Sequence, residues 1–379
     1  MIDCDFPGGN IIVERVDGDD VYLRQDLRDT EGDWFYWCFR VRGPAGRALT
    51  FRFTAGNVIG VRGPALSLDG GKTWQWLGAD AVQENSFSYA FGPGADDVRF
   101  SFGMPYMASD LRTFLERHRG NPALREETLC VTRRGRTVER LHVGRLRGKP
   151  EHRVLITCRH HCCEMMASYV LEGLLEQVLH GDDDGAWLRG NVELLVVPFV
   201  DKDGVEDGDQ GKSRRPRDHG RDYADESIYA STGAIRRLVP AWSEGRLRVA
   251  LDLHCPHIRG PHNEVIYQVG HPDVCASREQ CRFGEILEGA VSGPLPYQTS
   301  DDLPFGQAWN TGGNYSGGKG CSRWAAELPG VRLPSSFEVP YANAGGAEVN
   351  AETARAFGHD LARALRRYLE STGFRAGAQ

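Results

Sequence analysis

Two short, mostly apolar runs, residues 154–157 and 247–251, constrain the fold of this chain because each is followed by side chains that can bind metals. His161 and Glu164 follow the first run, and His254 follows the second. Runs of four or five residues that are rich in apolar and β-branched side chains are typical of buried strands. Open α/β sheets bind ligands outside the carboxyl ends of their strands. We therefore expect the three side chains to meet at one edge of a sheet.

The spacing of these residues predicts a metal site. His161 and Glu164 are three residues apart, and His254 lies 90 positions after Glu164 (254 − 164 = 90). Two histidines and a glutamate can hold one zinc ion and leave its fourth position open, which is the arrangement of a catalytic zinc site. The adjacent His160 is an alternative ligand, although only His161 has the three-residue spacing to Glu164. We predict one zinc ion per chain, bound by His161, Glu164 and His254.

Cysteines offer a second interpretation of the same region. Cys162, Cys163 and Cys255 flank the predicted ligands, and soft thiolates also bind zinc. A catalytic cysteine nucleophile is a further alternative. We prefer the two histidines and the glutamate, because that ligand set is complete without a thiolate.

Composition and charge favour an intracellular enzyme. The chain has 379 residues and a formal net charge of −7, which indicates neither a nucleic-acid surface nor a polybasic membrane patch. No apolar run approaches the roughly 18 to 20 residues of a membrane-spanning helix, and residues 1–5 lack the features of a signal peptide. Ten cysteines without regular spacing indicate reduced thiols. We expect a cytoplasmic protein without nucleic-acid or membrane partners.

The character of the chain changes between residues 120 and 150. Before this point, short aromatic runs such as 34–41, 49–53 and 98–102 alternate with Gly- and Asp-rich turns, which is typical of an antiparallel β-sandwich. After it, strand and helix patterns alternate, which indicates a mixed, mainly parallel sheet. We therefore predict an α/β protein with a β-sandwich domain at residues 1–125 and a catalytic α/β domain at residues 126–379.

Several segments together resemble a known family. These segments lie in both predicted domains, at residues 6–10, 27–30, 34–36, 104–111, 161–164, 198–204 and 335–341. The N-terminal matches are similar to the β-sandwich that precedes the catalytic domain in cytosolic carboxypeptidase-type members of the zinc carboxypeptidase family. The later matches, including the ligand motif, are similar to the catalytic half of that family. The resemblance implies a metalloprotease that hydrolyses peptide (amide) bonds. Two roles stay open for the sandwich, which are to shape one wall of the cleft or to mediate homo-oligomer formation.

Family membership would imply a glutamate that takes a proton from water activated by the zinc ion. Glu338 stands in a short run, residues 337–341, that resembles the family strand carrying this glutamate. The alternative is an ordinary strand carboxylate in a salt bridge. Glu327 is the competing candidate, and we prefer Glu338 because its setting resembles the family strand more closely.

The Arg-rich loop at residues 211–223 is expected to polarise the scissile carbonyl. The resemblance implies an arginine seven residues before an aspartate, and Arg215 and Asp222 have this spacing (222 − 215 = 7). A guanidinium suits the role because it is always charged and offers donors in fixed directions. A solvated basic loop is the alternative interpretation.

The same loop departs from the family in the residues that bind the substrate carboxylate. Counted from Asp222, the usual Asn-Arg pair is replaced by Ala224 and Asp225. An aspartate repels a carboxylate, so another arginine (Arg214, Arg217, Arg236 or Arg237) would have to bind the free carboxylate. If none does, a zinc deacylase or amidase acting on small N-acyl or amide substrates is the alternative function, and an amide-blocked peptide should be hydrolysed almost as well as the free acid.

A Gly-rich segment carries the last predicted site residue. Tyr315 lies 23 residues before Glu338 (338 − 315 = 23), close to where the family has a mobile tyrosine that covers the substrate. Glycines on both sides suit a moving loop. The alternatives are a plain loop tyrosine at this position and, for the whole chain, a binding module that kept the fold but lost catalysis.

Overall fold

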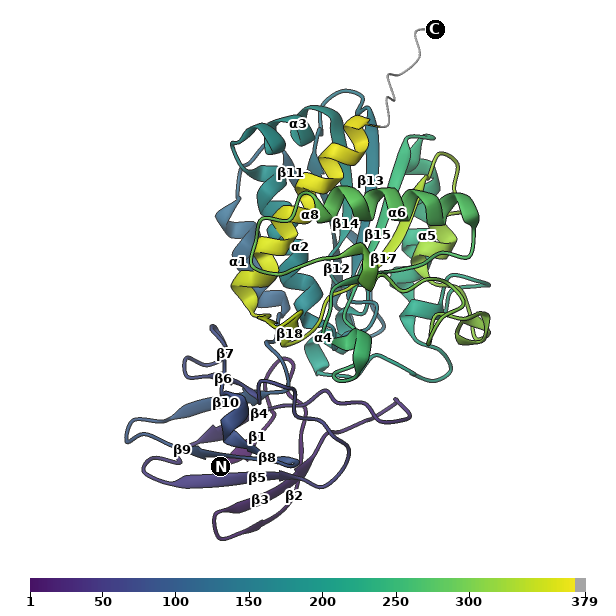
Figure 1. Ribbon diagram of the computed structural model, residues 1–379. Helices are drawn as coiled ribbons and strands as arrows, with labels where there is room; N and C mark the ends of the chain where they lie inside the picture. The colour runs from purple at the N-terminus through teal and green to yellow at the C-terminus, as the bar shows by residue number, and fades with distance from the viewer. Residues whose placement is uncertain (372–379) are drawn as a thin grey trace, which may run out of the picture.

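The computed structural model describes residues 1–371, and within them the chain forms two five-stranded sheets, one seven-stranded sheet and a two-stranded ribbon. The two five-stranded sheets lie at the N-terminal end of the molecule, below the part that contains the seven-stranded sheet (Figure 1). No helix in residues 1–371 is both long enough and apolar enough to cross a membrane.

The N-terminal strands form the orders β1-β4-β10-β6-β7 and β2-β3-β5-β9-β8. Their bounds are β1 Ile2–Asp3, β2 Ile12–Asp17, β3 Asp20–Arg24, β4 Cys38–Arg42, β5 Ala48–Phe53, β6 Ala65–Ser67, β7 Gln75–Trp76, β8 Val82–Gln83, β9 Ser86–Ala90 and β10 Asp97–Ser101. Alternate residues of β4, β5, β9 and β10 point inward, because successive side chains of a strand face opposite sides of its sheet.

Aromatic rings fill the space between these two sheets. The ring centres of Phe39 and Phe51, which come from different sheets, lie 5.1 Å apart, as do those of Phe87 and Phe100. The predicted antiparallel sandwich is thus present, with one departure: β3 and β5 pair in parallel. The chain visits the other sheet as β4 between them, and such a crossover allows two strands to run in the same direction.

The seven-stranded sheet has the order β11-β12-β14-β13-β15-β17-β16. The four central strands β14, β13, β15 and β17 are parallel. The strands β11 and β12 on one side and β16 on the other are antiparallel to their neighbours. The bounds are β11 Leu124–Val131, β12 Thr137–Gly144, β13 His152–Cys158, β14 Val192–Val197, β15 Leu247–His254, β16 Tyr267–Val269 and β17 Leu333–Glu338, with the ribbon β18 Asn343–Ala344 and β19 Ala347–Glu348. The mixed, mainly parallel sheet agrees with the sequence prediction.

Helices cover both faces of this sheet. Their bounds are α1 Ala108–Arg117, α2 Met165–Leu179, α3 Asp183–Asn191, α4 Lys202–Asp207, α5 Ala230–Ser243, α6 Val274–Glu288, α7 Cys321–Ala325 and α8 Ala351–Ser371, with short 3-10 turns η1 Ala79–Ala81, η2 His219–Arg221, η3 Pro261–Asn263, η4 Thr299–Asp301 and η5 Gly312–Tyr315. Val154 and Ile156 of β13 join the core under α2 and α8, which lie side by side (Figure 1), whereas Leu155 joins the core under α5. Apolar residues on both faces explain why β13 is buried along its whole length.

The N-terminal sheets are joined to the seven-stranded part by buried polar contacts. The Asn10 side-chain amide donates to the backbone oxygen of Gly208 at 2.7 Å, and the backbone N–H of Tyr36 donates to the side chain of Gln210 at 2.6 Å. The Arg28 guanidinium pairs with Asp209. These contacts fix residues 208–210, which directly precede the Arg-rich loop. The predicted boundary after residue 125 falls just inside β11.

Candidate metal centre

The three predicted metal ligands lie together at the carboxyl edge of the seven-stranded sheet. His161 and Glu164 lie in the turn between β13 and α2, and His254 is the last residue of β15, the parallel neighbour of β13. Their ligand atoms all lie within 4.8 Å of one another. The Glu164 carboxylate lies between the two rings, with Oε1 2.9 Å from Nδ1 of His161 and Oε2 2.7 Å from Nδ1 of His254.

The charge state of this group suits a divalent cation. Glu164 is fully buried. Burial alone would raise the pKa of its carboxyl, but the charges of Lys212, His161 and His254 bring this pKa well below its usual value. Glu164 is therefore an anion, and it faces two imidazole nitrogens. Two imidazoles and a carboxylate form a ligand set that zinc prefers, so the residues present fit a zinc ion.

Glu338 lies directly beside this group. In the pairing of β15 with β17, Glu338 stands opposite His254, and it lines the same cavity. Its Oε2 atom is buried and has no hydrogen-bond partner. Burial, the largest effect, and the nearby Glu164 carboxylate raise the pKa of Glu338 to about 7, although His254 and Lys212 oppose the rise. A carboxyl with a free oxygen and a pKa near neutrality can accept a proton. Glu327, by contrast, is exposed and pairs with Lys319 at 2.6 Å outside this cavity.

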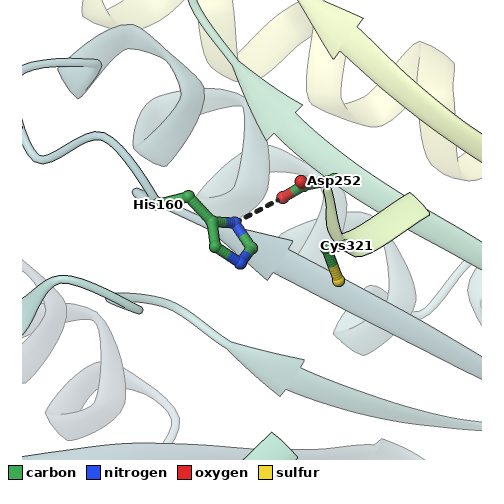
Figure 2. Close-up of side chains that lie close together, drawn as sticks. All are labelled: His160, Asp252 and Cys321. Atoms are coloured by element: carbon green, nitrogen blue, oxygen red, sulfur yellow. Dashed lines mark hydrogen bonds and ion pairs between the residues drawn. The ribbon is translucent and has the colours of Figure 1, made fainter. Parts of the chain in front are cut away.

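A second buried group contains Asp252 and His160 (Figure 2), and Asp252 also orients His254. Oδ2 of Asp252 lies 2.9 Å from Nε2 of His254, and Oδ1 lies 2.8 Å from Nδ1 of His160. Nε2 of His160 in turn lies 2.7 Å from the hydroxyl of Tyr223. His160 thus faces Asp252 and Tyr223 rather than Glu164, and it lies outside the group of His161, Glu164 and His254. Because Asp252 accepts the proton on Nε2 of His254, Nδ1 of that ring is left to face Glu164.

We expect Asp252→Asn to weaken zinc binding by about 10- to 100-fold, the usual cost of losing a carboxylate that orients a metal-binding histidine. Competition with a chromophoric chelator measures the affinity. Asp225→Asn is the matched control, because Asp225 lines a different cavity and should leave zinc affinity unchanged. Equal affinities in Asp252→Asn and the parent protein would contradict this role.

The positive charges at the cavity come from residues that the sequence reasoning did not select. The Lys212 ammonium lies 2.7 Å from Oε1 of Glu164 and donates to the backbone oxygen of Cys255 at 3.0 Å. Arg221, at the end of η2, lines the same cavity and lies 4.9 Å from the ring centre of Tyr315. Both residues lie in the Arg-rich loop, which lacks the periodicity of a strand or helix.

The structure does not bring the three predicted arginines to this cavity. Arg215 has an exposed side chain that pairs with Glu31, so it cannot polarise a carbonyl beside the metal group. Arg214 is buried among three carboxylates. Arg217 pairs with Asp222 and lines a separate cavity. The predictions that placed Arg215, Arg214 and Arg217 in contact with substrate therefore do not agree with their positions.

The sequence prediction counted from Asp222, whereas the aspartate that lies beside the metal group is Asp218. Oδ1 of Asp218 lies 3.6 Å from Nε2 of the ligand His161. The Asp222 carboxylate instead accepts hydrogen bonds from the backbone N–H groups of residues 228 and 229. Counted from Asp218, the position three residues later is Arg221 rather than Asp225. Asp225 lines the other cavity, so its charge does not oppose a carboxylate beside the metal group.

Tyr315 lies at the cavity, where the sequence reasoning expected it. Its ring lines the wall, its hydroxyl donates to Asn310 at 3.2 Å, and the Arg323 guanidinium lies 3.3 Å from its ring centre. Two arginines, Arg221 and Arg323, thus lie within 5 Å of the Tyr315 ring centre. Tyr315 also lines the second cavity, so it separates the two spaces.

The cavity has a volume of about 380 Å³, and both parts of the chain line it. Trp34 comes from the N-terminal part, and Trp309 comes from the loop before η5.

The cysteines that flank the predicted ligands are engaged elsewhere. Cys162 donates to the backbone oxygen of Asp209, and burial raises the pKa of Cys163 to about 11, which keeps it a neutral thiol.

Comparisons with known sequences find similarity to zinc carboxypeptidases. The family model described as zinc carboxypeptidase matches residues 115–235, a range that includes His161, Glu164, Lys212 and Arg221. The chain is 24% identical to cytosolic carboxypeptidase 2 of Xenopus tropicalis over 66% of this chain and 30% of that protein. It is 22% identical to cytosolic carboxypeptidase 6 of Caenorhabditis elegans over 76% of this chain and 68% of that protein.

An uncharacterised protein of Zymomonas mobilis, ZMO1242, is 27% identical over 54% of each chain. The chain thus spans about half or less of the length of two of these three curated relatives.

Solved structures show the same fold. A metallo-carboxypeptidase from Burkholderia cenocepacia superposes with a TM-score of 0.80 at 20% identity, over 98% of this chain and 99% of that one. A metallo-carboxypeptidase from Pseudomonas aeruginosa, solved with (2-guanidinoethylmercapto)succinic acid, superposes with a TM-score of 0.75 at 20% identity, over 98% and 99%. The chain therefore shares its fold with these metallo-carboxypeptidases, and its residues 115–235 are similar in sequence to zinc carboxypeptidases.

Proposed function

We propose that this protein is a zinc-dependent peptidase of the carboxypeptidase type. The observation that carries the proposal is the pairing of His254 with Glu338 on neighbouring strands, which sets an unpartnered carboxylate oxygen beside a buried group of two histidines and a glutamate. His161, Glu164 and His254 would hold the ion. When bound, zinc supplies Lewis-acid activation of water and of the scissile carbonyl.

The remaining roles follow from charge and position. Glu338 takes the proton from the attacking water and later passes it to the leaving amine. Lys212, rather than Arg215, supplies the fixed positive charge that stabilises the oxyanion, since its ammonium lies beside the metal group. Arg221 binds the free carboxylate of the substrate, and Tyr315 covers the bound residue.

Arg221 also favours a carboxypeptidase over an amidase. The amidase alternative depended on the lack of a carboxylate-binding arginine, and Arg221 lines the cavity. A guanidinium pairs with a carboxylate through charge-assisted hydrogen bonds, which are stronger than neutral ones. A peptide with a free carboxylate is therefore the proposed substrate.

We expect Arg221→Ala to lower kcat/KM for a free-acid peptide by roughly 10- to 100-fold, the cost of one charge-assisted contact, and to change hydrolysis of the matching peptide amide little. Steady-state kinetics of the zinc-loaded protein on N-acyl dipeptides and their amides measures this difference. Arg217→Ala tests the carboxylate-binding role that the sequence analysis gave to this residue of the same loop. A loss selective for the free acid in Arg217→Ala, with Arg221→Ala unaffected, would restore that assignment. Hydrolysis of N-acyl amines alone would support the amidase.

A further inference from the structure

The N-terminal sandwich reaches the metal centre through one loop, residues 27–37. This loop pairs with the segment that follows Lys212: Thr30 and Arg214 form a backbone bridge, and the backbone N–H of Arg215 donates to the oxygen of Asp29 at 3.2 Å. An ion pair of 2.9 Å between Asp29 and Arg214 reinforces the pairing. The position of the active-site lysine is thus set partly by the sandwich.

The same loop places an aromatic ring in the wall of the cavity. Trp34 lines it, with the Lys212 ammonium 5.4 Å from its ring centre and the His257 ring 5.8 Å away. The indole N–H donates to the backbone oxygen of Glu31 at 2.9 Å, which fixes the orientation of the ring. Trp309, on a different loop, lines the same cavity with a side chain that is 39% exposed. An exposed tryptophan beside a cavity is typical of a contact surface for a ligand.

Charge and position indicate what the two tryptophans could bind. Two acidic side chains of this loop are paired with arginines, since Asp29 pairs with Arg214 and Glu31 pairs with Arg215 at 2.5 Å. The indole ring of Trp34 adds an apolar surface to the cavity wall. Arg221 contacts Tyr315, whereas Trp34 contacts Lys212 and His257. A substrate whose carboxylate is held by Arg221 would place the part on the amino side of its scissile bond toward Trp34.

We infer that Trp34, together with Trp309, forms a subsite for an aromatic or large apolar side chain on the amino side of the scissile amide. The inference rests on the proposed function and gives the N-terminal sandwich, which we place at residues 1–125, a direct part in substrate selection. Offset or edge-to-face packing of a substrate ring against an indole provides the selectivity.

The test uses the full-length, zinc-loaded protein and two N-acetyl dipeptides that share one C-terminal residue, chosen as the residue that the wild-type protein hydrolyses fastest. One dipeptide has phenylalanine on the amino side, and the other has glycine. We expect wild-type kcat/KM to be higher for the phenylalanine substrate. Trp34→Ala should lower kcat/KM for that substrate by about tenfold, and leave the glycine substrate nearly unchanged.

Trp74→Ala is the matched control, because its indole N–H also donates to a backbone oxygen three residues earlier, that of Gly71, and Trp74 lies outside the cavity. It should leave both substrates unchanged. Trp34→Phe keeps an aromatic ring and should keep most of the preference even if Trp34→Ala folds poorly. An equal loss on both substrates in Trp34→Phe, or no loss in Trp34→Ala, would overturn the subsite. If the wild-type protein hydrolyses neither dipeptide nor any other free-acid peptide, the proposed function fails and the subsite with it.

Discussion

Glu338→Gln is expected to lower turnover by about 100- to 10,000-fold, the usual range for the loss of a positioned general base. The amide has nearly the same shape as the carboxyl but cannot accept the proton of the attacking water. Zinc affinity should stay close to that of the parent protein, because Glu338 is not one of the three ligands. Single-turnover kinetics and a zinc titration on the same preparation separate the two effects.

Glu327→Gln is the control for this prediction, because Glu327 is exposed and paired with Lys319 outside the cavity. The pH profile offers a second check. Only the ionised carboxylate accepts a proton, so activity should fall as the pH drops through the pKa of Glu338. That pKa is about 7 without the ion, and the positive charge of zinc lowers it. An active Glu338→Gln with an inactive Glu327→Gln would reverse the assignment.

His254→Ala is expected to weaken zinc binding by about 100-fold or more, because it removes a ligand rather than a residue that orients one. Removal of this ring also removes one of the positive charges that hold the pKa of the buried Glu164 carboxyl below its usual value. His257→Ala is the matched control, since His257 lines the cavity three residues later but is outside the ligand group. Unchanged zinc affinity in His254→Ala would show that the ion binds elsewhere.

The residues at regular strand ends were predictable from the sequence. β13 is apolar on both faces, so a short run identified it, and the turn after it placed His161 and Glu164 at the sheet edge. His254 follows the same logic, because it is the last residue of a parallel strand. Glu338 also ends a parallel strand, but it was selected because its setting resembles the family strand.

The loop residues were not predictable in the same way. Between residues 208 and 222 the backbone follows contacts with the N-terminal sheets, such as that of Asn10 with Gly208, rather than a repeating pattern. Several arginines there have similar local sequence, and only three-dimensional contacts separate Arg221, at the cavity, from Arg215, at the surface. A count from Asp218 would have found Arg221. The sequence offers no comparable signal for Lys212 or Trp34.

The contacts that tie the sandwich to residues 208–215 also bear on how the molecule folds. Asn10 and Gly208 are 198 positions apart, and Tyr36 and Gln210 are 174 apart, so these bonds close long loops and form late. During synthesis the sandwich emerges first and can fold as a unit. The loop that carries Lys212 can dock only where this surface is already formed. Glu338 comes still later in the chain, so the group of His161, Glu164 and His254 has no Glu338 beside it until β17 pairs with β15.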